Sequence, residues 1–228
     1  MTILYEDSAL LVCLKPAGLL SQPKADGQEE SMLSRLASYL APQGATPYPV
    51  HRLDRQTGGL MVFAKNKAAA AALSAAAAGD GMQKEYLAVV EGDPAAAGCP
   101  PQGHLRDLLY FDRGRDKAYV VTRERRGVHD ARLFYTVAGH YPGGEACPVP
   151  LSLLRIRLET GRTHQIRAQF ASRKLPLFGD GRYGAQTRGA LGLFAASLTF
   201  PHPQSGKRLT YTASPASLLP FSLFKIDG

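Results

Sequence analysis

Residues 51–60 read HRLDRQTGGL and lead directly into an unbroken apolar run that ends at Ala64. Such a run is typical of a short buried strand, so we expect a strand at 59–64 with the polar loop at the rim of the core. A nearby opposite charge favours the ionised form of an acid, and Arg52 and Arg55 are expected to keep Asp54 a carboxylate. An oriented carboxylate can act as a nucleophile. The alternative is that Asp54 only caps a turn or pairs with a surface arginine.

Alternating and β-branched residues predict further strands on both sides of this loop. Apolar spacing predicts two helices, and an alanine-rich composition predicts a third. Ser31 and Asn66 are suitable caps for the first two helices, and Lys15 to Gly18 reads as a turn. Arg155 and Arg157 alternate with apolar residues, which predicts one wet, basic strand face. The expected strands are 3–5, 10–14, 84–90, 118–122 and 151–158, and the expected helices are 31–40, 67–78 and 163–170.

The order of these elements indicates an α+β fold with a mixed, mostly antiparallel sheet, because strands are dispersed among helices without a strict βαβ rhythm. Residues 93–103 are rich in Pro, Ala and Gly and predict a connection. We therefore expect residues 1–228 to form one catalytic domain of two lobes with a boundary near 93–103.

The charge balance favours a polyanionic partner. Lys plus Arg number 27 against 19 Asp plus Glu, which gives a net charge of +8. Residues 104–135 hold the densest group of arginines, which either grips phosphates or forms a solvated charged face. The three cysteines lack C-x-x-C spacing, and no leader-like segment or membrane-length apolar run is present, so we expect a cytoplasmic protein with reduced cysteines and no metal.

Four segments, in order, resemble the RluA-type RNA pseudouridine synthases, which modify ribosomal or transfer RNA. Residues 10–18, LLVCLKPAG, resemble the family's strand followed by K-P-x-G, and 51–60 resemble its H-R-L-D-x-x-T-S-G signature. Residues 84–88, KEYLA, are similar to K-x-Y-x-A. Residues 160–167, TGRTHQIR, and 176–184, PLFGDGRYG, are similar to the family's last motif.

The resemblance implies the pseudouridine synthase fold, a bent sheet with flanking helices and a central catalytic cleft. It implies that Asp54 is the catalytic residue, that Arg52 enters the RNA stack, that Tyr86 lies beneath the uracil, and that Arg167 pairs with Asp54. A base must leave its helix to react, and planar groups such as Arg52 and Tyr86 suit the vacancy and the flipped ring. Further substrate-binding residues expected from the motif are Arg162, His164, Gln165 and Ile166.

The same resemblance implies RNA as the partner, a monomer without an obligate protein partner, no cofactor, and no separate N-terminal RNA-binding domain. The sequence departs from the family pattern at Gly58, at Ala168-Gln169 and at Phe194. Two other functions stay open: a non-catalytic RNA-binding module or chaperone, and a hydrolase that releases uracil.

Overall fold

The chain folds into two compact units in a computed structural model that describes residues 1–23 and 29–226. The first unit comprises residues 1–84 and 195–213, and the second comprises 85–194 and 214–228. The chain crosses from one unit to the other within β5 (Gln83–Glu91) and β10 (Leu193–Pro201). The segment 93–103, where we expected a lobe boundary, lies inside the second unit.

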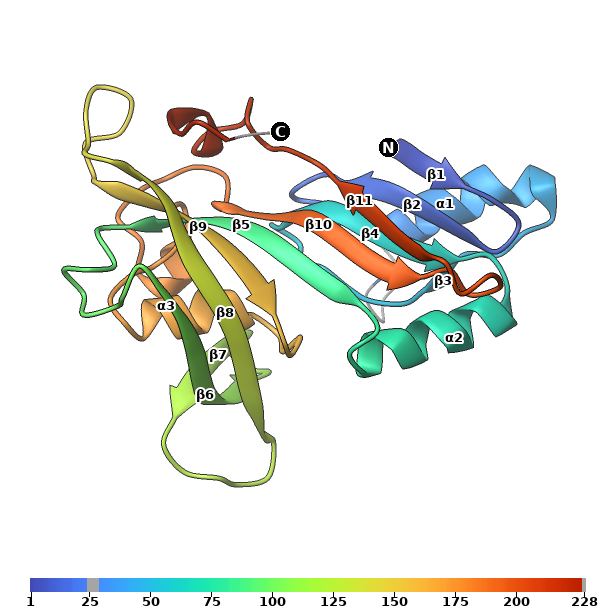
Figure 1. The fold of residues 1–228 in the computed structure, drawn as a ribbon, viewed down its shortest axis with the longest axis horizontal. Helices are drawn as coiled ribbons and strands as arrows, with labels where there is room; N and C mark the ends of the chain where they lie inside the picture. Colours follow the sequence, from blue (N-terminus) through green and yellow to red (C-terminus); the bar gives the residue numbers. More distant parts are fainter. Residues whose placement is uncertain (24–28, 227–228) are drawn as a thin grey trace. The chain divides into compact units, whose positions relative to one another are not determined.

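The first unit is built on a sheet whose strand order is β1-β2-β4-β10, with β11 paired to β10 and β3 paired to β4 (Figure 1). The pairs β1–β2, β2–β4, β3–β4 and β10–β11 are antiparallel. The elements that lie wholly in this unit are β1 (Thr2–Glu6), β2 (Leu10–Lys15), α1 (Met32–Leu40), η1 (Ala41–Gln43), β3 (Tyr48–Pro49), β4 (Gly58–Ala64), α2 (Lys67–Ala78) and β11 (Arg208–Thr212).

The two helices of the first unit begin at the residues whose side chains cap them. Ser31 Oγ accepts the Ser34 N–H at 3.1 Å, and Asn66 Oδ1 accepts the Ala69 N–H at 2.9 Å. Both predicted caps are confirmed. In the alanine-rich α2, Ala69 and Leu73 pack on the sheet side against a cluster from β2, β4 and β10.

The second unit is a sheet with the strand order β5-β9-β8-β6-β7, and one helix, α3, lies against one face (Figure 1). The pairs β6–β7, β6–β8 and β8–β9 are antiparallel. Tyr135 on β8 meets Phe170 on α3 edge to face, with ring centroids 5.5 Å apart. The elements that lie wholly in this unit are β6 (Gln102–Asp112), β7 (Lys117–Val121), β8 (Val128–Tyr141), β9 (Leu151–Leu158), α3 (Gln165–Ala171), η2 (Gly181–Tyr183) and η3 (Phe221–Leu223).

The predicted α+β class with a mostly antiparallel sheet is confirmed. Strand β9 has the predicted bounds, and its Arg155 and Arg157 are exposed while Leu154 and Ile156, which alternate with them, are buried. The helix expected at 163–170 begins instead at Gln165, because His164 takes a left-handed conformation with a φ of 55°. No helix in the described ranges 1–23 and 29–226 has the length and apolar character needed to span a membrane.

Gly59 allows a close backbone approach between β4 and β10. Its φ is 119°, and a Cβ at this position would lie 2.3 Å from the carbonyl oxygen of Ala195 on β10. Only a residue without a side chain permits both this conformation and this contact between β4 and β10.

We expect Gly59→Ala to lower the free energy of unfolding by about 3 kcal/mol or more, because overpacking and left-handed strain add. Urea denaturation followed by circular dichroism measures this. The matched control is Gly161→Ala, where the added Cβ meets no atom within 4 Å. Equal effects of the two substitutions would contradict the packing argument.

Candidate active site

Asp54 lies in a loop that is tied to the segment after β2 at several points. Ser21 Oγ accepts the Leu53 N–H at 3.0 Å and donates to the Leu53 carbonyl at 2.7 Å. The Gly18 N–H donates to the carbonyl of Arg55 at 2.8 Å, and the Thr57 N–H donates to the carbonyl of Asp54 at 3.0 Å. The backbone on both sides of Asp54 is therefore fixed, and this fixes the position from which the half-buried Asp54 side chain extends.

Lys15 provides the buried centre of this connection. Its ammonium donates to the carbonyl oxygens of Pro16, Leu19 and Arg55 at 3.0, 2.7 and 3.0 Å, so all three of its hydrogens have acceptors. Only 1% of the residue is exposed. Burial lowers the pKa of Lys15 to about 8, and the negative charge of Asp54 acts against that shift. One buried cation thus joins the turn after β2 to the loop that carries Asp54.

The two arginines beside Asp54 differ in their surroundings. Arg55 donates from Nε to the carbonyl of Gly18 at 3.0 Å and from Nη1 to Glu29 at 2.7 Å. Arg52 is exposed and thus accessible to a ligand. Arg55, which we expected only to keep Asp54 ionised, therefore also braces the loop.

His51 anchors the start of the loop in the core. Its Nε2 accepts the Val62 N–H at 3.2 Å, and burial, together with the charge of Lys84, lowers the pKa of His51 to about 3. A neutral imidazole with an accepting Nε2 carries its hydrogen on Nδ1. Nδ1 is buried and has no partner among the described residues. His51 is therefore a neutral anchor of the loop.

Arg167 is held in the second unit by a buried ion pair and an aromatic ring. Its Nε and Nη2 donate to the two carboxylate oxygens of Asp180 at 2.7 and 2.8 Å, and the two side chains are 8% and 2% exposed. The guanidinium also lies 4.9 Å from the centroid of the Tyr183 ring. The motif at 176–184 thus supplies two partners of Arg167, to which the sequence alone assigned no role.

Tyr183 connects Arg167 to the neighbouring hairpin. Its hydroxyl accepts the Ala118 N–H at 2.8 Å and shares a hydrogen bond of 3.1 Å with His164 Nδ1. The Lys117 ammonium lies 4.9 Å from the centroid of the same ring. These contacts fix the ring against which Arg167 stacks, and they give the buried His164 a positioning role.

The remaining predicted residues of the second unit divide between structural and exposed positions. Gln165 accepts the Thr160 hydroxyl at 2.8 Å and the Arg162 N–H at 3.0 Å, which fixes the turn before α3. Ile166 is a core residue. Arg162 is exposed, and its Nε donates to the carbonyl of Asp130 at 3.0 Å. Tyr86 lies on β5 and is 7% exposed.

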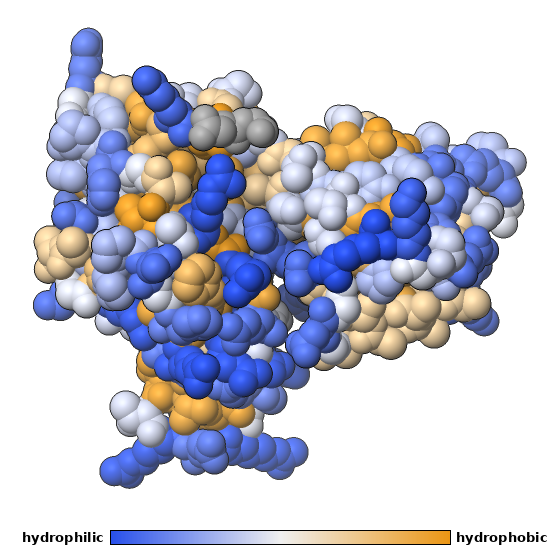
Figure 2. Space-filling view, in the orientation of Figure 1, coloured by the Kyte–Doolittle hydropathy of each residue, from blue (hydrophilic) through white to orange (hydrophobic). Residues whose placement is uncertain are grey.

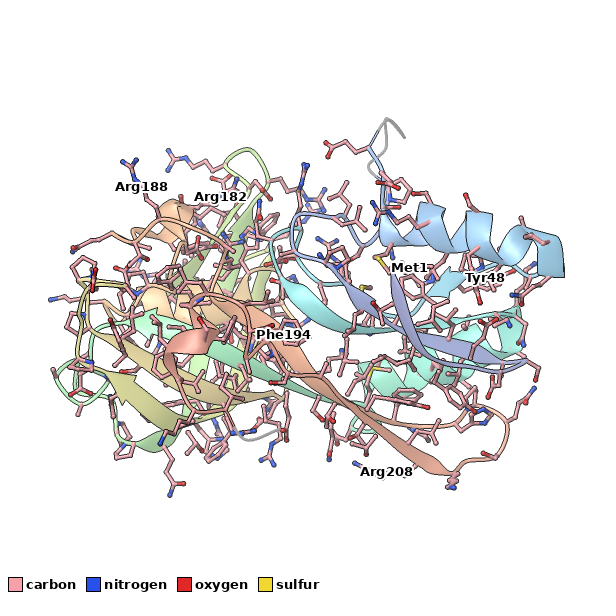
Figure 3. The ribbon with its side chains drawn as sticks, turned by 90° about the horizontal axis from the view of Figure 1, so that it is seen from above. Met1, Tyr48, Arg182, Arg188, Phe194 and Arg208 are labelled. Carbon is pink, nitrogen blue, oxygen red and sulfur yellow. The ribbon has the colours of Figure 1, made fainter. Side chains whose placement is uncertain are left out.

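Asp54 and Arg52 belong to the first unit, whereas Tyr86 and Arg167 belong to the second. The predicted meeting of Asp54 with Tyr86 and Arg167 therefore stays a prediction. Phe194, one of the departures from the family pattern, packs edge to face with Phe221 of η3 at a centroid distance of 6.4 Å (Figure 3). Within the described part of the chain, no three His, Cys, Asp or Glu side chains are grouped to hold a metal ion.

Comparison with known proteins gives a consistent set of similarities. Residues 9–172 match the family model described as RNA pseudouridylate synthase. The chain is 34% identical to ribosomal large subunit pseudouridine synthase D of Zymomonas mobilis, across 93% of this chain and 68% of that protein. Its identity to the protein of the same name from Xanthomonas campestris is also 34%, across 93% and 65%. The chain thus spans about two thirds of the length of these relatives.

Solved structures show a similar fold. Human RNA pseudouridylate synthase domain containing 1 matches with a TM-score of 0.75 and 21% identity, across 96% of this chain and 85% of that one. Human RNA pseudouridylate synthase domain containing 4 matches with a TM-score of 0.73 and 23% identity, across 97% and 90%.

We expect the stability of the protein to depend on pH through His51. The unfolded side chain titrates near 6.5 and the folded one near 3, so the unfolded state binds more protons between these values. The contribution of His51 is complete above pH 6.5 and is lost as pH falls toward 3. The urea midpoint of the wild type should therefore fall more steeply in this window than that of His51→Gln, which keeps an acceptor but does not titrate. His129→Gln, at an exposed position, should follow the wild type.

We expect Asp180→Asn to lower the free energy of unfolding by about 3 kcal/mol or more, because it leaves the buried Arg167 without this counter-ion. The control is Asp116→Asn, whose partner Arg182 is 43% exposed, and which should cost less than about 1 kcal/mol. Urea denaturation of both variants checks the difference. Equal losses would show that burial does not set the strength of the Arg167 pair.

Proposed function

The chain belongs to the RNA pseudouridylate synthase family, whose members are isomerases, and we propose that it converts specific uridines of ribosomal RNA to pseudouridine with Asp54 as the catalytic residue. The family match over residues 9–172 and the relatives named for the large ribosomal subunit support this proposal. Transfer RNA is the alternative substrate.

The braced loop supports a catalytic role for Asp54. Ionised carboxylates can form covalent intermediates or accept protons, and both tasks need a fixed geometry. Lys15, Ser21 and Gly18 hold the backbone on either side of Asp54, which is more restraint than a turn-capping residue requires. In the proposed reaction, Asp54 either attacks the ribose C1′ or assists loss of a proton from the ribose.

The chemistry is an isomerisation within one nucleotide. The bond between C1′ and uracil N1 breaks, the base turns, and C1′ bonds to C5. The hydrogen on C5 is lost to solvent and N1 gains a proton, so no electron acceptor and no imported group are needed. This balance is why we propose that the reaction uses no metal or organic cofactor.

The other predicted residues receive proposed roles around this reaction. Arg52 is exposed and planar, and fills the space left by the flipped nucleotide. Tyr86 lies beneath the uracil. Arg167, oriented by Asp180 and Tyr183, is the counter-ion of Asp54, and Arg162 binds phosphate. Ile166, His164 and Gln165 shape and fix the segment that presents Arg167.

We also propose that the protein acts as a monomer in the cytoplasm, without an obligate protein partner. Its three cysteines are free and buried, as suits a reducing compartment.

We expect Asp54→Asn to reduce pseudouridine formation by about 10³-fold or more, because the substitution removes the reacting carboxylate but keeps its size. Large-subunit ribosomal RNA and transfer RNA transcripts carrying tritium at uracil C5 release tritium to water when C5 bonds to C1′. RNA binding, measured by filter retention, should change less than about threefold, since the substitution replaces a carboxylate by an amide of the same size and removes no cation that binds phosphate.

The control is Asp80→Asn, at an exposed position of the same unit, which should keep full activity. Full activity of Asp54→Asn would contradict the proposed role of Asp54. A wild type that releases no tritium while the variant still complements a deletion strain would favour an RNA-binding module. Free uracil in solution would indicate a hydrolase.

A further inference from the structure

The sheet of the second unit has one face against α3 and an opposite face that carries arginines. Along β8, Leu133 and Tyr135 are buried, whereas Arg132 and Phe134 alternate with them and point the other way. We define the arginine face as the side chains on this opposite face of three neighbouring strands, β6, β8 and β9. Its members are His104 and Arg106 on β6, Arg132 and Phe134 on β8, and Arg155 and Arg157 on β9.

Three planar side chains form a row across this face. Arg157 is directly opposite Phe134, and Phe134 is directly opposite His104 in the strand register. The Arg157 guanidinium lies 5.6 Å from the Phe134 ring centroid, and the His104 and Phe134 centroids are 5.0 Å apart. Aromatic rings and guanidinium planes at strand spacing are surfaces on which unpaired bases stack.

The charges of the arginine face are only partly balanced within the protein, since Arg132 pairs with Asp130 at 3.2 Å and with Glu159 at 3.7 Å. Arg106, Arg155 and Arg157 are exposed, and none of them has an ion pair with any residue in the described ranges. Arg106 also lies directly opposite Arg132 in the register, and facing like charges destabilise a sheet. Asp130 and Glu159 offset the charge of Arg132. An anionic ligand would offset the charges of Arg106, Arg155 and Arg157.

The loop after β7 also carries exposed arginines beside an aromatic ring. Arg123, Arg125 and Arg126 are exposed, and the Arg125 guanidinium lies 4.5 Å from the centroid of Tyr110 on β6. Figure 2 shows hydrophilic side chains interleaved with apolar patches over β6, β8 and β9, and hydrophilic side chains over this loop. Cations beside half-buried rings suit nucleotides better than an acidic peptide, because a peptide of this kind supplies negative charge but no bases.

We propose that the arginine face binds a single-stranded segment of RNA, with phosphates on the arginines and bases against the row formed by Arg157, Phe134 and His104. A duplex hides its base faces, so the row favours unpaired RNA. The identity of the ligand as RNA rests on the proposed function. The role of the surface is separate: it binds nucleotides other than the reacting uridine, and it adds affinity and selection of sequence context.

The test measures binding of the full chain to a fluorescein-labelled oligocytidylate of about 12 nucleotides, a length within the range that one binding surface covers. This probe contains no uridine to occupy the catalytic site. Arg155→Glu/Arg157→Glu should weaken binding by about tenfold or more. It should reduce the slope of log affinity against log salt by about 0.7 or more, because Arg155 contacts a phosphate and about 0.7 is expected for each phosphate contact on a single strand.

Phe134→Leu tests stacking separately from charge. It should weaken binding about fivefold or more while leaving the salt slope unchanged, since the lost contact is to a base.

The matched control for the charge reversal is Lys207→Glu/Arg208→Glu, which makes the same change of net charge at exposed positions of the first unit. Figure 3 labels Arg208. This control for Arg155→Glu/Arg157→Glu should bind oligocytidylate within about threefold of the wild type.

Wild-type affinity in Arg155→Glu/Arg157→Glu, or an equal loss in the control, would overturn the proposal. Should the charge reversal unfold the protein in circular dichroism, Phe134→Leu alone decides, and unchanged binding then overturns it. Failure of the proposed function would appear elsewhere, as a wild type that releases no tritium from labelled RNA yet still binds oligocytidylate through this face.

Discussion

The arrangement of the first unit around Asp54 depends on the buried ammonium of Lys15. A charged group inside a protein is costly unless every hydrogen finds an acceptor, and the three carbonyls around Lys15 meet that condition. One of these carbonyls belongs to Arg55, forty positions further along the chain. The need to satisfy one cation therefore fixes two loops against each other, and Asp54 inherits its position from that constraint.

A comparable constraint organises the second unit around Arg167. The guanidinium has a carboxylate in its plane and a ring against its face, and the ring is itself held by Ala118 and His164. In both units, a buried charged side chain, Lys15 or Arg167, is held in place by the groups that bind it. In the second unit, the left-handed backbone of His164 sets the start of α3, which carries Arg167. Side chains held in this way lose little freedom when a substrate arrives, which favours tight geometry at the moment of reaction.

Local signals in the sequence predicted much of the fold and few of the long-range contacts. The caps at Ser31 and Asn66 and the alternation in β9 act over a few residues, so they could be identified without a structure. Lys15 was predicted only as part of a turn, because its burial depends on carbonyls distant in sequence. The extents of β6 and β8 were missed, since cations and rings on their exposed sides obscure a simple polar alternation. The motif around Arg167 identified the residue but not its partner Asp180.

The way the chain returns to the first unit has a consequence for its synthesis. Strand β10, which lies against β4 through the backbone contact at Gly59, is encoded more than a hundred residues after β4. As the nascent polypeptide leaves the ribosome, most of one edge of β4 has no hydrogen-bonding partners while residues 85–194 of the second unit are translated. Exposed strand edges attract other chains, so this protein is most vulnerable to aggregation during that interval.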